Sequence, residues 1–205
     1  MTNSATLTPP PPPPTAAAPP TPTVAHSLAT LPQTRKKNRQ SIKRSDLRDQ
    51  LWPGCHDKFW DRTNNNGFTT VPRLLPLIMT LMGKLSGKLD PSKVYFELWA
   101  RVFDEGVVTI TSPLDVAYAA GYTGKRAERT LNERLLRLHE LGFINGKPDG
   151  NREWVHILIV NPLQAAVDLH AQGRVPAEWW SAFVRRAGEV GATLPPPTAT
   201  TATTT

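Results

Sequence analysis

Apolar side chains recur at helical spacing in three stretches between residues 90 and 142, and proline or glycine marks their boundaries. The first stretch follows the capping sequence Asp90-Pro91 and ends at Gly106. The second opens at Ser112-Pro113 and runs through residue 120, and the third spans 125–141. Residues 107–111 (VVTIT) are typical of a short strand. The predicted order is therefore helix, strand, helix, tight turn and longer helix.

A hairpin is predicted next, because strand-like residues 143–144 and 152–160 flank the turn sequence Lys147-Pro-Asp-Gly-Asn151. Two more helices are predicted, one from Asn161-Pro162 and one over 176–191. Upstream, the apolar stretch 74–85 is predicted to form a helix that starts after Pro76. The pattern indicates a mainly α fold with a small β-hairpin and additional N- and C-terminal helices.

Composition limits the folded part of the 205-residue chain. All fifteen aromatic residues lie between Trp52 and Phe183, whereas ten of the 21 prolines lie in residues 1–34. We therefore expect one compact domain over 51–192 and disordered Pro/Thr/Ala-rich tails over 1–34 and 193–205. The six consecutive prolines at 9–14 favour a polyproline II spacer, with docking to an aromatic groove of a partner as the alternative.

Positive charge is concentrated in one arm, residues 35–50, which contains seven Lys and Arg residues and only two aspartates. The arm has a net charge of +5 and the 51–192 domain only +2. A flexible basic arm beside a nearly neutral domain indicates a polyanion partner, and a solubilising linker is the alternative. The candidate phosphate-contacting residues of the arm are Arg35, Lys36, Lys37, Arg39, Lys43 and Arg44.

The order of elements from 90 to 160 resembles the winged helix-turn-helix. Many recognition helices of that family end in a phrase similar to Leu138-His-Glu-Leu-Gly-Phe-Ile144, and Gly121 stands where their turn glycine stands. The distance from Gly121 to Gly142 is about one helical turn longer than the common pattern. The resemblance implies that 125–141 is a recognition helix and that the hairpin is a wing.

A second resemblance concerns Gly67-Phe-Thr-Thr-Val-Pro72, which is similar to the opening of plasmid replication initiators, where a Phe-x-x-x-Pro phrase precedes the first winged domain. Residues 60–192 as a whole resemble uncharacterised winged-helix proteins of bacterial plasmids. These resemblances imply sequence-specific binding of double-stranded DNA, as a transcriptional regulator or a plasmid replication or maintenance factor. The alternative is a winged-helix module for protein–protein contacts, with an arm that binds nucleic acid nonspecifically.

On helix 125–141, an apolar stripe from Ala127 to Leu141 is expected to face the core, which leaves the opposite arc for DNA. That arc is predicted to hold Lys125, Arg126, Arg129, Asn132, Glu133 and Arg137. Glu133 could accept from a cytosine amine or pair with a neighbouring arginine, and Arg134 is expected to be paired or snorkelling. Lys147 and Arg152 of the hairpin are expected to contact phosphate or the minor groove. The alternative for the outer arc of the 125–141 helix is an ordinary solvated surface that does not bind DNA.

Nothing in the sequence indicates an enzyme, a cofactor, a metal, a membrane contact or a small-molecule ligand. Cys55-His56-Asp57 has suitable residue types for nucleophilic catalysis, but side chains adjacent in sequence rarely converge on one atom. The first residues lack the pattern of a signal peptide, so we expect a cytoplasmic protein associated with the nucleoid or a plasmid.

The 176–191 helix carries an aromatic stripe, and a homodimer through it would suit a palindromic site. In the alternative, the rings cap the core against Trp99 or the 74–85 helix. The stripe consists of Trp179, Trp180, Phe183, Val184 and Ala187.

Overall fold

The computed structural model describes residues 39–56 and 58–198. The chain divides into two units, residues 1–59 and 60–205, which are described separately. In the first unit, α1 spans Arg39–Leu51, so the part of the basic arm that is described is helical. Its thirteen residues contain neither glycine nor proline and are rich in Arg, Lys, Gln and Leu, which favour helix. Arg35, Lys36 and Lys37 lie outside the described residues.

The second unit is mixed α/β. Together with α1, the described residues form seven α-helices, a 3₁₀ turn (η1) and one three-stranded antiparallel sheet. After α1 the order is α2 Leu75–Ser86, η1 Gly87–Leu89, α3 Ser92–Arg101, β1 Val107–Thr109, α4 Pro113–Ala119, α5 Ala127–Glu140, β2 Ile144–Asp149, β3 Arg152–Ile159, α6 Pro162–Ala171 and α7 Ala177–Val190.

Local sequence signals account for the helix boundaries. Ser112 accepts a hydrogen bond from the backbone N–H of Asp115 at 3.4 Å at the start of α4, and Asn161 accepts from the N–H of Leu163 at 3.0 Å at the start of α6. Asp90 accepts from the N–H of Ser92 at 2.9 Å before α3. These helices begin where the proline and capping residues predict.

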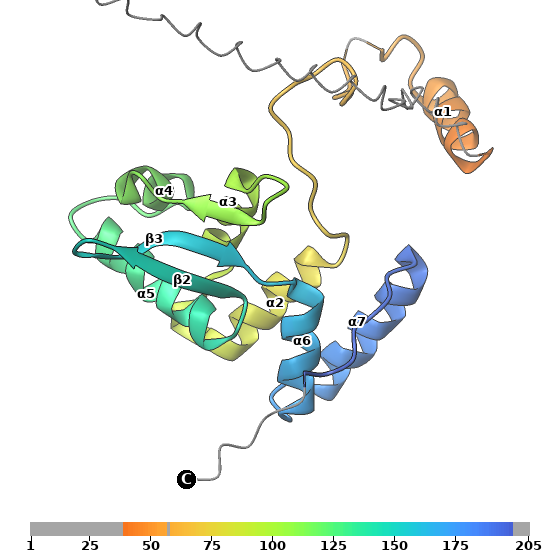
Figure 1. Cartoon of the computed structure of the whole chain (residues 1–205). Helices are drawn as coiled ribbons and strands as arrows, with labels where there is room; N and C mark the ends of the chain where they lie inside the picture. Colours follow the sequence, from red (N-terminus) through yellow and green to blue (C-terminus); the bar gives the residue numbers. More distant parts are fainter. Residues whose placement is uncertain (1–38, 57, 199–205) are drawn as a thin grey trace, which may run out of the picture. The chain divides into compact units, whose positions relative to one another are not determined.

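The sheet has the order β1-β3-β2. Val107 of β1 is opposite Leu158 of β3, and Ile144 of β2 is opposite Ile159. The hairpin turn is shorter than expected, because β2 continues to Asp149 and only two residues, Gly150 with φ +56° and Asn151, separate it from β3. Figure 1 shows the β2–β3 hairpin alongside α5, with α6 and α7 following it.

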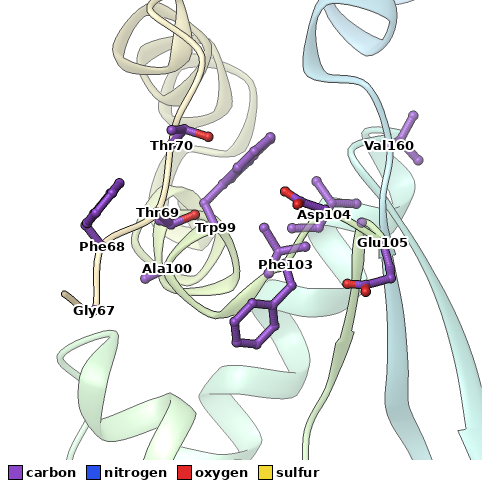
Figure 2. A pocket seen from close by; sticks show the side chains of 13 residues that line it. Gly67, Phe68, Thr69, Thr70, Trp99, Ala100, Phe103, Asp104, Glu105 and Val160 are labelled. Carbon is purple, nitrogen blue, oxygen red and sulfur yellow. The ribbon is translucent and has the colours of Figure 1, made fainter. Parts of the chain in front are cut away.

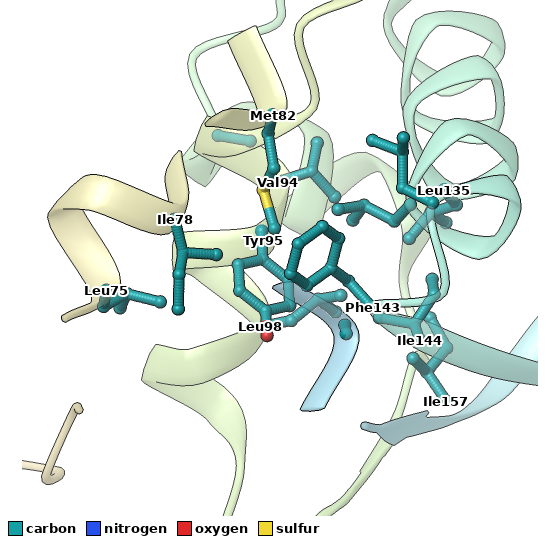
Figure 3. Close-up of a cluster of buried hydrophobic side chains, with 14 of the residues drawn as sticks. Leu75, Ile78, Met82, Val94, Tyr95, Leu98, Leu135, Phe143, Ile144 and Ile157 are labelled. Atoms are coloured by element: carbon teal, nitrogen blue, oxygen red, sulfur yellow. The ribbon is translucent and has the colours of Figure 1, made fainter. Parts of the chain in front are cut away.

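One hydrophobic core joins α2, α3, α5 and the sheet to α6 and α7. Figure 3 shows the part of this core that lies between α2, α3, α5 and the sheet. The rings of Tyr95 on α3 and Phe143, which precedes β2, lie 5.5 Å apart between centroids, at a steep angle. Ile78 and Met82 of α2 and Leu135 of α5 are buried in the same cluster. The core therefore depends on α2, which lies outside the 90–160 region.

The aromatic stripe of α7 packs mainly within the chain. Trp179 is buried and its indole N–H donates to the carbonyl oxygen of Leu77 in α2 at 2.8 Å. Trp180 stacks on the imidazole of His170 in α6 with ring centroids 3.8 Å apart. Phe183 is also buried, whereas Val184 is 43% exposed. The alternative that these rings cap the core against the 74–85 helix is confirmed for Trp179, and the homodimer stays a prediction.

The C-terminal segment is ordered further than expected. Residues 193–198 were expected to be disordered, but Leu194 packs against the core and Thr198 contacts α6. The backbone N–H and the hydroxyl of Thr198 donate to the two carboxylate oxygens of Asp168 at 2.7 and 3.0 Å. The tails expected over 1–34 and beyond residue 198 lie outside the described residues.

Across the residues that the structure describes, no helix has the length and apolar character that crossing a bilayer requires.

Candidate nucleic-acid interface

Helix α5 buries one face and exposes the other. Its apolar stripe is buried as predicted, through Ala127, Leu131, Leu135 and Leu138. The side chains of Arg129 and Asn132 are exposed on α5, and Lys125 and Arg126 are exposed in the turn that leads into it. Four of the six residues expected on the outer arc are therefore exposed to solvent.

The connection between α4 and α5 contains two glycines in the left-handed region. Gly121 has φ +86° and Gly124 has φ +81°, a conformation that other residues rarely adopt. The N–H of Tyr122 donates to the carbonyl oxygen of Ala117 at 2.8 Å, which closes the turn after α4. This turn sets the direction of α5 and places Lys125 and Arg126 at its N-terminal end.

Glu133 pairs within the helix. Its carboxylate accepts from Nε of Arg129 at 3.0 Å and lies 3.8 Å from Nη1 of Arg134. The predicted pairing with a neighbouring arginine is thereby confirmed for Arg129. Because the Arg129 side chain is 80% exposed, the pair is worth less than about 1 kcal/mol and can open when Arg129 meets a stronger acceptor.

Arg137 corrects the predicted outer arc. Its guanidinium turns toward the C-terminal end of α2, where it donates to the carbonyl oxygen of Leu85 at 2.6 Å and to the hydroxyl of Ser86 at 3.1 Å. A third bond reaches Glu140 at 2.8 Å. The last carbonyls of a helix have no partner in their own helix, and a forked cation satisfies them well. Arg137 is thus a structural residue rather than a candidate reader.

Arg134 has a similar role, as the sequence predicts. Nη2 of Arg134 donates to the carbonyl oxygen of Lys88 in η1 at 3.1 Å, and the guanidinium lies 5.9 Å from the ring centroid of Tyr122. Its side chain is only 12% exposed.

Sequence reasoning missed Leu136, which is 46% exposed on α5. At 100° per residue it lies in the middle of the outer arc, one turn after Asn132. Its helical angle is the sequence signal that places it on this face, although its side chain is apolar. An exposed aliphatic group on such a face can contact the methyl group of thymine.

Lys147 on β2 and Arg152 on β3 are both exposed, and Arg152 also forms a hydrogen bond within the protein. Nη1 of Arg152 donates to the carbonyl oxygen of Thr111, just before α4, at 3.2 Å. Gly146 was also missed: a Cβ at this position would overlap the ring of buried Trp154 on β3. This close approach fixes the hairpin where Lys147 and Arg152 are presented.

In the first unit, Lys43 and Arg44 are exposed on α1, and Arg39 begins the helix. Arg48 pairs with Asp49 at 2.6 Å and lies 4.3 Å from the ring centroid of Phe59. The half-buried thiol of Cys55 and the imidazole of His56 belong to the same unit, and Asp57 lies outside the described residues. His56 lies 3.9 Å from Asp49.

Comparison with family models, with curated proteins and with solved structures finds no match to this chain. The resemblances to winged-helix proteins and to plasmid replication initiators therefore stay expectations from the sequence.

Proposed function

We propose that residues 90–160 form a winged helix-turn-helix that binds double-stranded DNA, with α5 in the major groove and the β2–β3 hairpin as the wing. The order α3-β1-α4-α5-β2-β3 and the sheet order β1-β3-β2 support this proposal. The direct packing of α4 against α5 across the Gly121 turn also supports it.

The single observation that carries the proposal is the exposed set Lys125, Arg126, Arg129 and Asn132, opposite the buried stripe of α5. Lysine and arginine bind phosphates or the acceptor edge of guanine, and asparagine can pair with adenine. The helix diameter suits the major groove, so these groups can reach base edges while the stripe keeps α5 on the core.

Three exposed cations, Lys125, Arg126 and Arg129, lie at the N-terminal end of α5 and can bind phosphate, and exposed Glu128 lies among them. Arg134 and Arg137 are bonded inside the protein and add no exposed charge. Exposed Lys43 and Arg44 of α1 supply further phosphate contacts, which add affinity but no sequence information. The role in the cell that accompanies this activity is transcriptional regulation or plasmid replication or maintenance.

Fluorescence anisotropy of the full chain tests the proposal, with a labelled random duplex and a duplex enriched by the protein from a random library. In the double variant Lys125→Ala/Arg126→Ala, we expect affinity to fall at least about tenfold and the salt slope to decrease by about two. The matched control Arg185→Ala/Arg186→Ala removes the same charge from exposed positions of α7 and should change binding much less. Equal losses in the two variants would count against α5 as the DNA-binding helix.

A further inference from the structure

A large open hollow lies away from α5. It encloses about 860 Å³ between the extended residues 67–70, the end of α3, the loop into β1 and the end of β3 (Figure 2). Aromatic side chains of Phe68, Trp99 and Phe103 line it. This volume is within the range of pockets that bind small ligands.

The aromatic side of the hollow is unusually exposed. Phe103 has 81% of its surface accessible, more than any other large apolar side chain among the described residues. Phe68 is 44% exposed and is braced by Trp60, with the ring centroids 5.7 Å apart. Aromatic rings held at the surface around a depression are typical of protein interaction sites rather than of folding cores.

The rim is acidic. Asp104 and Glu105 follow Phe103 directly, and the residues lining the hollow include no lysine, arginine or histidine. Neither carboxylate forms a salt bridge within the part of the chain that the structure describes. The nearest arginine in sequence, Arg101, is paired with Glu97. In a chain of net charge +7, this local charge favours a cationic partner and opposes a phosphate backbone.

We propose that this hollow is a docking site for a short segment of a partner protein in which an apolar side chain adjoins a lysine or arginine. The apolar side chain packs against Trp99 inside the hollow, and the cation pairs with Asp104 or Glu105 and contacts the exposed ring of Phe103. The proposal is independent of DNA binding, since no residue of α5 or of the β2–β3 turn lines the hollow.

The test is a selection from random short peptides displayed on phage, with the full chain as bait, followed by titration of the enriched synthetic peptides. We expect enriched peptides to share an apolar residue next to lysine or arginine. Their affinity should fall at least about tenfold in Phe103→Ala and in the double variant Asp104→Asn/Glu105→Gln. Because these side chains are exposed, the variants should unfold at the same denaturant concentration as the wild type.

Tyr118→Ala is the matched control, because Tyr118 is an aromatic residue of α4 that is 74% exposed and does not line the hollow. It should leave peptide affinity unchanged. The proposal is overturned if no peptide is enriched, if enriched peptides lack a basic residue, or if Phe103→Ala binds them as the wild type does. Self-association that Phe103→Ala abolishes would assign the hollow to a second copy of the chain and also overturn it. DNA affinity of Phe103→Ala, which keeps the net charge and is expected to equal that of the wild type, separates this outcome from failure of the DNA proposal.

Discussion

The guanidinium of Arg137 in α5 donates to the carbonyl oxygen of Leu85, 52 positions earlier in the chain, at 2.6 Å. The bond closes the C-terminal end of α2 and fixes α5 against it. The proposed recognition helix is thus positioned by a helix outside the 90–160 region as well as by its own buried stripe.

Arg137→Ala should lower the free energy of unfolding by about 1.5–3 kcal/mol, because a charged donor is lost and helix-end acceptors are left with fewer partners. Arg137→Lys should recover only part of this loss, since an ammonium group cannot reproduce the fork. Arg129→Ala is the control: its exposed pair with Glu133 predicts a change below about 1 kcal/mol. Urea unfolding measures all three, and equal effects of Arg137→Ala and Arg129→Ala would contradict this role.

Two glycines should respond in opposite directions to alanine. Gly146→Ala is expected to destabilise the protein by about 1–3 kcal/mol, because its Cβ overlaps the ring of Trp154. Gly188→Ala should stabilise it by about 0.5–1 kcal/mol, because Gly188 lies inside α7 with no neighbouring atom near the new methyl group. Thermal unfolding of the two variants checks both signs, and a neutral Gly146→Ala would show that the hairpin can shift.

The contact between Asp168 and Thr198 should depend on pH. Burial raises the pKa of Asp168, but hydrogen bonds from the Thr198 N–H, from Gln164 and from the Thr198 hydroxyl outweigh it and hold the pKa below its ordinary value. A carboxyl whose pKa is lowered by folding stabilises the folded state above the ordinary pKa of about 4, and loses that contribution as the pH falls through the folded value.

We therefore expect the chemical shift of the Thr198 amide to change as the pH falls below the ordinary pKa range of aspartate. Protonation of Asp168 weakens the hydrogen bonds from Thr198 that hold this segment against α6. In Asp168→Asn this titration should disappear. A Thr198 amide that is indifferent to pH, or one that titrates equally in the variant, would exclude the contact in solution.

Trp179→Phe should lower the free energy of unfolding by about 1–3 kcal/mol, since it removes the donor to the Leu77 carbonyl while keeping an aromatic ring in the core. Val184→Ala, at a 43% exposed position of the same helix, should change it by no more than about 0.5 kcal/mol. Denaturant unfolding distinguishes them, and similar values would mean that the indole bond contributes little.

Analytical ultracentrifugation tests the predicted homodimer, whose interface would lie on the same helix, α7. Because Trp179 and Phe183 are buried within the chain, an interface on α7 must use Val184 and its exposed neighbours. A wild-type dimer that Val184→Asp converts to a monomer would support it, and a monomeric wild type would end the dimer hypothesis.

The sequence predicted the helices well where chemistry is local. Ser112-Pro113 and Asn161-Pro162 predict the starts of α4 and α6, because a capping side chain and a proline stabilise the first helical turn that contains them. It predicted the buried stripe of α5 for the same reason: helical angles follow from spacing alone. Arg137 was placed wrongly because a helical angle does not reveal which neighbour, here the end of α2, covers that side.

Other features depended on contacts that spacing cannot show. Gly146 of β2 lies so close to Trp154 of β3 that it has no room for a Cβ. Thr198 donates to Asp168, which lies thirty positions earlier in the chain. No helix was predicted in the arm, although its lack of glycine and proline between Arg39 and Leu51 favours α1.

The most direct test of the central claim is an NMR titration of the assigned full chain with a DNA duplex selected by the protein from a random library. We predict that the largest amide shift changes fall on residues 125–133 and around Lys147 and Arg152, with smaller changes on α1, and that Arg129→Ala reduces the preference for the selected duplex over a random one. Changes confined to α1, with residues 125–133 unperturbed, would contradict α5 as the DNA-binding helix and leave only a nonspecific arm.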